Sequence, residues 1–162
     1  MNRLHLLPVA LLVFGLASCA TTHQTTLGEN YSTISIPVFK NETMEVGLEE
    51  TITASVIRAF VRDRRLRVTD RSHADVVLEG RITQVDIEAM GFTDVDRAIG
   101  YNMTMVVQAQ LVDGDTGQVL TSQPTFTVRG PFLLSNEPTT ERQQDIASTL
   151  ADSMISRFLD GW

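Results

Sequence analysis

Cysteine is almost absent from this sequence, since Cys19 is the only one. An intramolecular disulfide is therefore excluded, and any zinc site would have to form without a pair of thiolates. Histidine is also scarce: His5 and His23 precede the patterned part of the chain, and His73 alone remains, where we expect a turn residue. Basic residues number 13 against 20 acidic ones, for a net charge of −7, which disfavours general nucleic-acid binding.

Motifs for catalysis are missing as well. The sequence has no nucleophile elbow, no dinucleotide-binding glycine motif and no phosphate-binding loop. Two carboxylate pairs, Asp94 with Asp96 and Asp113 with Asp115, could hold calcium, but the other EF-hand ligands are lacking. We interpret both pairs as solvated loop tips. The sequence thus predicts a binding or assembly module with no cofactor, metal or enzymatic activity. A lipid-anchored enzyme is an alternative, and only these two carboxylate pairs support it.

No apolar run reaches the roughly 20 residues that a transmembrane helix needs, but a shorter one lies at the N-terminus. Arg3 precedes an apolar stretch, residues 4–16, and small residues follow it. A positive start, a short apolar core and a small-residue cleavage site predict a signal peptide, residues 1–18. We therefore expect an exported protein.

The end of this signal resembles the bacterial lipobox, with Leu16, Ala17 and Ser18 ahead of Cys19. The resemblance implies cleavage before Cys19 and acylation of that cysteine with an S-diacylglycerol and an N-acyl group. Several lipid chains together give stable membrane anchoring, which one chain does not. Ala20 lacks the aspartate of an inner-membrane retention signal, so we expect a lipid anchor on the periplasmic side of the outer membrane.

The remaining chain is long enough for one domain with its own core. Residues 19–31 are small and polar without periodicity, which predicts a lipidated tether, and its first 12 residues reach at most about 40 Å when extended. Residues 32–162 then form a single domain. Repeats and low-complexity segments are absent from it.

Alternating apolar residues predict four strands in this domain. The first spans 33–39, where Pro37 favours an edge strand, and the second starts near Ala74 with a phase flip at Thr83 and Gln84 that suggests a bulge. The third, 101–111, has the clearest alternation. A hairpin loop at 113–117 leads into a fourth strand that runs from Val119 to Phe132 with an interruption at Pro124.

Two amphipathic helices complete the pattern. Leu48, Ile52, Val56 and Phe60 recur at helical spacing, with glutamates early and arginines late, as the helix dipole favours. Ile146, Leu150, Met154 and Phe158 step by four from a start near Pro138 to a stop at Gly161. The predicted fold is an α+β two-layer sandwich, with both helices on one face of a four-stranded, largely antiparallel or mixed sheet.

Half of the basic residues that follow the signal gather around the end of the first helix. They are Arg58, Arg62, Arg64, Arg65, Arg67 and Arg71. One interpretation is a solvated helix C-terminus whose positive charges interact favourably with the helix dipole. The other is a patch for an anionic partner, in which arginine forks bind phosphates.

Several motifs, taken in order, resemble the LPS-assembly lipoprotein family, LptE. They are Ile36-Pro37-Val38-Phe39-Lys40-Asn41-Glu42-Thr43, Gly47-Leu48-Glu49-Glu50, Ala74 to Ile82, Tyr101 to Met105, and Asp115 to Leu120. The resemblance implies a lipoprotein that plugs and helps assemble the outer-membrane barrel LptD, for insertion of lipopolysaccharide into the outer leaflet. The resemblance assigns no lipopolysaccharide-contacting residue to this sequence, and it does not decide whether the protein binds lipopolysaccharide directly.

The first strand and helix also resemble outer-membrane lipoproteins that activate a periplasmic cell-wall synthase. Such a protein would regulate an enzyme instead of plugging a barrel. Those lipoproteins usually have a long tether that crosses the periplasm, whereas residues 19–31 would keep this domain near the membrane. Tether length therefore favours the barrel partner.

The polar face of the last two strands suggests where a barrel would contact the domain. Its residues are uncharged: Asn102, Thr104, Gln108, Gln110, Gln123, Thr125 and Thr127. A water-facing strand in an acidic chain would be expected to carry more charged groups. Amides and hydroxyls can instead exchange hydrogen bonds with a polar lumen without desolvating charges. Because threonine favours strands in any setting, a simply solvated face is the alternative.

Overall fold

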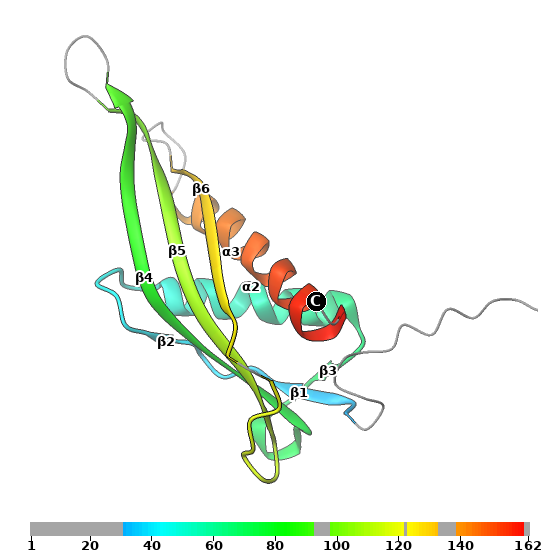
Figure 1. The fold of residues 1–162 in the computed structure, drawn as a ribbon. Coiled ribbons are helices and arrows are strands. Elements are labelled where there is room, and N and C mark those ends of the chain that lie inside the picture. The colour runs from blue at the N-terminus through cyan, green and yellow to red at the C-terminus, as the bar shows by residue number, and fades with distance from the viewer. Residues whose placement is uncertain (1–30, 93–97, 122, 133–138, 161–162) are drawn as a thin grey trace, which may run out of the picture.

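The structure, a computed structural model, describes residues 31–92, 98–121, 123–132 and 139–160. Its elements are β1 (Thr33–Ser35), β2 (Lys40–Asn41), α2 (Leu48–Asp63), β3 (Arg67–Val68), η1 (Arg71–His73), β4 (Val76–Phe92), β5 (Ala98–Asp113), β6 (Thr125–Phe132), α3 (Thr139–Ile155) and η2 (Ser156–Asp160). The chain is thus a mixed α+β domain with two long helices and one sheet (Figure 1).

The sheet has six strands, in the order β3-β1-β4-β5-β6, with β2 also pairing with β4. β1 and β2 run parallel to β4, whereas β4, β5 and β6 form an antiparallel meander. The predicted count of four strands is therefore wrong. The two additional strands, β2 and β3, contain two residues each, which is too short to show an alternation in the sequence.

The first predicted strand is shorter than expected and is not an edge. β1 ends at Ser35 and lies between β3 and β4, and pairing with β4 resumes only at Lys40 in β2. Pro37 falls in the gap, where its missing N–H costs no ladder hydrogen bond. The fourth predicted strand likewise begins later, at Thr125, and Val119 forms only an isolated bridge with Val112.

The bulge expected at Thr83 is confirmed. Ile82 pairs with Val107 and Gln84 with Val106, so Thr83 is an extra residue between two paired ones. Its hydroxyl donates to the carbonyl oxygen of Val106 at 3.3 Å. Because an inserted residue exchanges the two faces, Ile82 and Val85 can both point toward the helices.

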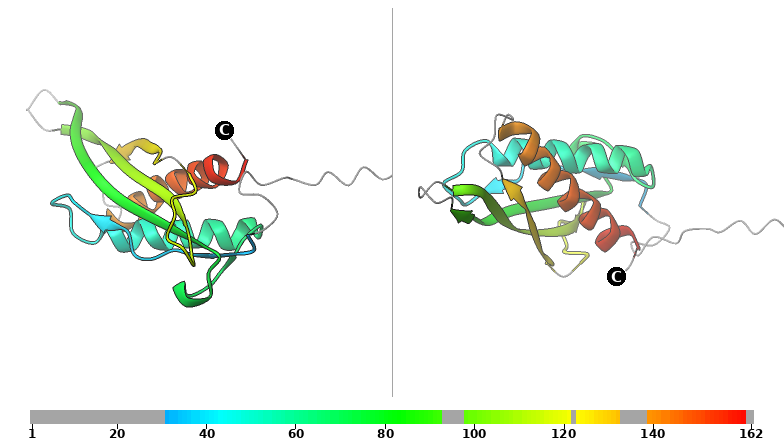
Figure 2. Two further views of the ribbon diagram at one scale, coloured as in Figure 1. Left: turned by 60° about the horizontal axis from the view of Figure 1, so that its bottom comes forward. Right: turned by 90° about the horizontal axis from the view of Figure 1, so that it is seen from above.

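Both helices lie against one face of the sheet, and the core fills the space between the layers (Figure 2). α2 buries Leu48, Ile52, Val56 and Phe60, which confirms the predicted stripe. The stripe of α3 is buried too, and it extends into η2, where the Phe158 ring lies 5.7 Å from that of Phe126 in β6. Full burial stabilises the fold by about 1.5–3 kcal/mol for each large apolar side chain.

The loop between β2 and α2 is organised by Asn41. Its amide nitrogen donates to the Glu45 carbonyl oxygen at 2.7 Å and to Glu49 Oε2 at 2.8 Å, while its amide oxygen accepts from the backbone and hydroxyl of Thr43. Gly47 then precedes α2 as its N-cap residue with φ of 86°, a conformation that favours glycine. These residues of the sequence motif therefore shape the loop.

Asp75 fixes the start of the domain to the sheet. Its Oδ2 accepts hydrogen bonds from the Ser32 backbone at 2.8 Å, the Ser32 hydroxyl at 2.9 Å and the Thr33 backbone at 2.9 Å. The Ser32 donors contribute most to lowering the pKa of Asp75, from 3.8 to about 2. The chain that arrives from the tether is thus held by a carboxylate beside β4.

We expect Asp75→Asn to lower stability at neutral pH. A folded-state pKa below the unfolded value stabilises the fold above about pH 4, and this contribution is lost as pH falls toward 2. The carboxylate is partly exposed and screened, so we expect about 1 kcal/mol at pH 7. Urea unfolding from pH 7 to pH 2.5 should show the difference from the unsubstituted protein shrinking below about pH 4. Asp70→Asn is the control, and an equal loss in both variants would contradict this role.

Candidate functional site

The strand register divides the side chains of β4, β5 and β6 between two faces of the sheet. Met103, Met105 and Val107 of β5 point into the core. The alternate residues point away from the helices, and we call this side the outer face. It consists of Val77, Glu79, Arg81, Gln84, Asp86 and Glu88 in β4, Asn102, Thr104, Val106, Gln108, Gln110 and Val112 in β5, and Thr125, Thr127, Arg129 and Pro131 in β6.

The outer face is uncharged along β5 but not along its neighbours. The structure places Asn102, Thr104, Gln108, Gln110, Thr125 and Thr127 together on this face, as expected from their alternation. β4 adds several charged groups to it, and Arg129 of β6 donates to the Thr104 hydroxyl at 3.0 Å. The outer face is therefore an uncharged central strand beside a charged one, and its contact with a barrel stays a prediction.

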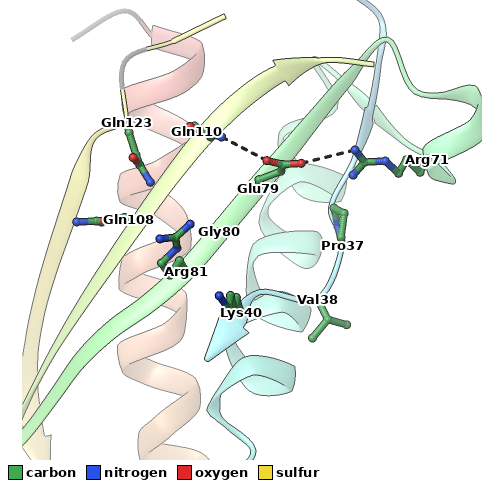
Figure 3. Close-up of a pocket in the computed structure, with 10 residues that line it drawn as sticks. All are labelled: Pro37, Val38, Lys40, Arg71, Glu79, Gly80, Arg81, Gln108, Gln110 and Gln123. Carbon is green, nitrogen blue, oxygen red and sulfur yellow. Dashed lines mark hydrogen bonds and ion pairs between the residues drawn. The ribbon is translucent and has the colours of Figure 1, made fainter. Parts of the chain in front are cut away.

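A shallow hollow of about 270 Å³ lies on the outer face between the ends of β1 and β2 and the central strands (Figure 3). Glu79 lines it, accepting from Gln110 Nε2 at 3.3 Å and pairing with Arg71 at 3.6 Å. Arg81 and Lys40 both pair with Glu42, at 3.5 and 3.3 Å. Gln108 and Gln123 line the same hollow. Amide, guanidinium and carboxylate groups together suit hydrogen bonding to a polar partner surface.

The described residues offer little for catalysis. No group of three or more histidine, cysteine or acidic residues is arranged to hold a metal ion in the described ranges. His73 is exposed in η1, as expected for a turn residue. Asp113 caps its own hairpin, because its Oδ1 accepts from the Thr116 backbone and hydroxyl, each at 2.8 Å, and these bonds lower its pKa.

Several of the six arginines of the predicted anionic-partner patch have partners within the domain. Arg62 pairs with Asp152 of α3 at 3.0 Å, and Arg65 pairs with Asp63 and with Asp160 of η2. Arg71 instead reaches Glu79 on the outer face, and Arg58 donates to Ser55 within α2. Arg64 and Arg67 are exposed and have no ion-pair partner in the described part of the chain. Arg71 thus reaches the outer face, whereas the other five lie in α2 or shortly after it; binding of an anionic partner stays a prediction.

Arg65 is expected to be a structural residue that links α2 to the C-terminal turn. Only 21% of its side chain is exposed, and its hydrogen bonds to Asp63 are the main cause that raises its pKa. We expect Arg65→Ala to lower the free energy of unfolding by about 1–2 kcal/mol, between the values for exposed and buried pairs. Arg67→Ala, at an exposed arginine nearby, should change it by less than about 0.5 kcal/mol. Equal unfolding midpoints for the two variants would contradict this role.

Several predicted site residues lie outside the described residues. They are the lipobox Leu16, Ala17 and Ser18, the lipidation site Cys19, and the acidic pair Asp94 and Asp96. Their roles stay predictions. Phe92, at the end of β4, is described and is 63% exposed.

Among the described helices, none has the length and apolar character needed to cross a membrane.

Sequence reasoning missed the charged half of the outer face. Glu79 and Arg81 were visible in the second alternation, on the side opposite Leu78 and Ile82. Their position beside Gln110 and Gln108 depends on the strand register, which alternation alone does not give.

Comparison with known families gives one match. The sequence model of the family described as LptE, lipopolysaccharide-assembly, matches residues 31–158. A comparison with curated proteins finds no match. The matched range spans every described element from β1 to α3 and most of η2.

Solved structures share the fold at low sequence identity. A protein from Xanthomonas campestris aligns with a TM-score of 0.57 and 13% identity, covering 83% of this chain and 90% of that chain. A hypothetical protein from Chlamydia trachomatis gives 0.57 and 8%, covering 78% and 95%. A subunit of the PelC dodecamer from Paraburkholderia phytofirmans gives 0.54 and 12%, covering 80% and 90%. At these identities the likeness shows the fold alone.

Proposed function

The chain belongs to the LptE family of lipopolysaccharide-assembly lipoproteins, which is not enzymatic, and we propose that it is the lipoprotein partner of the outer-membrane barrel LptD. In this role it plugs the barrel lumen, helps the barrel assemble, and so supports insertion of lipopolysaccharide into the outer leaflet. Acylated Cys19 holds it on the periplasmic side of the outer membrane. Direct lipopolysaccharide binding is not part of the proposal.

The observation that carries this proposal is the uncharged central strand of the outer face. Asn102, Thr104, Gln108 and Gln110 present amides and a hydroxyl over most of the length of β5, and Thr125 and Thr127 continue them on β6. Such groups can exchange water for the polar wall of a lumen at a small cost, since each can form a new hydrogen bond there. A charged strand would incur a much larger desolvation cost.

The short tether supports a partner in the same membrane. β1 begins at Thr33, and Asp75 binds the backbone of Ser32 and Thr33 directly before it. Only the residues between Cys19 and the hydrogen bonds of Asp75 can span the distance to the lipid. Their extended reach is at most about 40 Å. A barrel in the outer membrane lies within that reach.

Purification of the full-length lipoprotein from outer membranes tests the proposal. We expect the LptD barrel to be recovered with it in near-equal amounts, as judged by quantitative mass spectrometry. As a control for association after lysis, outer membranes that contain the lipoprotein are mixed before solubilisation with isotope-labelled outer membranes that lack it, and labelled barrel should not be recovered. Recovery of a cell-wall synthase without the barrel would contradict the proposal and support the activator alternative.

A further inference from the structure

The long strand β4 has an open edge over its second half. β4 contains 17 residues, but β1 and β2 pair only with Val76, Val77, Arg81 and Ile82. From Gln84 onward, β5 pairs with one side of the strand, and no described strand pairs with the other. Figure 1 shows this part of β4 continuing past β2 as the outermost strand. Every second residue of such an edge has a free backbone N–H and C=O.

The open edge is exposed, and its protection against pairing is limited to two acidic residues and the bulge that precedes it. Gln84, Asp86, Ile87, Glu88 and Ala89 are all exposed, and Ile87 leaves 42% of its apolar side chain uncovered. The segment contains no proline and no lysine, which natural proteins use to block edges. The register shift between Ala89 and Gly91 limits the regular part to residues 84–89.

The opposite edge of the same sheet, strand β6, is protected against further pairing. β6 pairs with β5 alone, but Pro131 removes one N–H donor from it. Helix α3 also packs against β6, and Gly130 lies so close to Ile146 that an added Cβ would approach it at 2.7 Å. One edge of the sheet is thus blunted, whereas the edge at residues 84–89 of β4 is available for pairing.

We infer that an extended segment of the barrel partner adds to the sheet as a strand along residues 84–89 of β4, an inference that rests on the proposed function. Asp86 and Glu88 lie on the outer face of this edge and have no cationic partner among the described residues; Asp86 accepts only from Gln84 Nε2, at 2.6 Å. Charge complementarity gives the added strand lysine or arginine opposite these acids. On its other face it carries apolar residues that cover Ile87. Main-chain hydrogen bonds supply affinity, and these alternating side chains supply specificity.

A second copy of this chain fits the edge poorly. Antiparallel self-pairing centred on Ile87 places Asp86 opposite Glu88 twice, and centring on Asp86 places it opposite its own copy. Like charges that lie directly opposite each other destabilise a strand pair. A basic strand of a different protein avoids this repulsion.

Hydrogen exchange of the purified lipoprotein, free and in complex with the LptD barrel, tests the inference. Strand addition should slow exchange by tenfold or more at every second amide of residues 84–89, and should leave the β6 edge at 125–130 less affected. Equal slowing of both edges, without alternation, would mean that the lumen only shields the domain, and would overturn the inference. Slowing in the free protein that grows with its concentration would identify a second copy and would also overturn it.

A charge-reversal pair gives a second measurement. Asp86→Lys combined with Glu88→Lys should weaken recovery of the barrel by roughly tenfold, since two cross-strand attractions become repulsions. Asp115→Lys combined with Asp145→Lys changes the net charge equally at the hairpin loop and on α3, and should leave recovery unchanged. Equal weakening by both pairs would overturn the inference.

The two experiments together separate the inference from the proposed function. If the barrel is recovered normally and residues 84–89 exchange freely, strand addition fails while the proposed function stands. If no barrel is recovered even with the unsubstituted protein, both fail.

Discussion

Cys19→Ala is expected to remove the protein almost completely from the outer membrane and to leave its signal sequence uncleaved. The reason is that the thiol of Cys19 is the predicted attachment point of the lipid, and the chain contains no second cysteine to replace it. Each buried methylene contributes about 0.8 kcal/mol, so several acyl chains together provide essentially all of the membrane affinity. Membrane fractionation with labelled palmitate would measure both the location and the acylation of the variant.

Thr22→Ala is the matched control for this experiment. It changes a small polar residue three positions later and leaves the lipobox intact, so we expect normal cleavage, labelling and fractionation. A Cys19→Ala protein that is still cleaved and still sediments with outer membranes would contradict the predicted anchor. The short tether would then no longer support a partner in the same membrane.

The long elements of this fold could be predicted because their patterns are long. The alternation from Tyr101 to Leu111 gives β5, and the step-by-four stripes give α2 and α3. Even the bulge at Thr83 was visible, because it exchanges the faces within a single run of alternating residues. β2 and β3 could not be found, since two-residue strands have no period and form only where tertiary packing aligns them with a neighbour.

The candidate site was predictable to a lesser degree. Alternation alone placed Gln108 and Gln110 on one face, but only the register brings Arg81 and Glu79 beside them. The ion pairs of the arginines could not be predicted from the sequence either. Arg62 and Arg65 are close to each other in sequence, yet their partners Asp152 and Asp160 lie at the other end of the chain, and a one-dimensional pattern does not reveal ion pairs of that kind.

Three glutamates on the outer face, Thr104→Glu with Gln108→Glu and Thr125→Glu, are expected to weaken the complex with LptD while the isolated domain still folds. Each carboxylate would have to leave water when the interface closes, and removal of an unpaired charge from water costs several kcal/mol. Arg129 lies beside Thr104 and Arg81 is the cross-strand partner of Gln108, so these arginines can neutralise two of the three. The remaining charge, at about 1.5 kcal/mol or more, should still weaken the complex by at least roughly tenfold.

The register shows which control this experiment needs. Gln108 and Thr125 are direct cross-strand partners, so two glutamates there repel each other and lower the stability of the free domain by up to about 1 kcal/mol. A glutamine variant, Thr104→Gln with Thr125→Gln and Gln108 retained, has the same side-chain shapes at all three positions and differs only in charge. Circular dichroism and thermal unfolding should show both variants folded, and barrel recovery should fall only for the glutamate variant. Equal recovery of the two would mean that the outer face is simply solvated, and that any barrel contact runs through the loops around Phe92 and Leu133-Leu134.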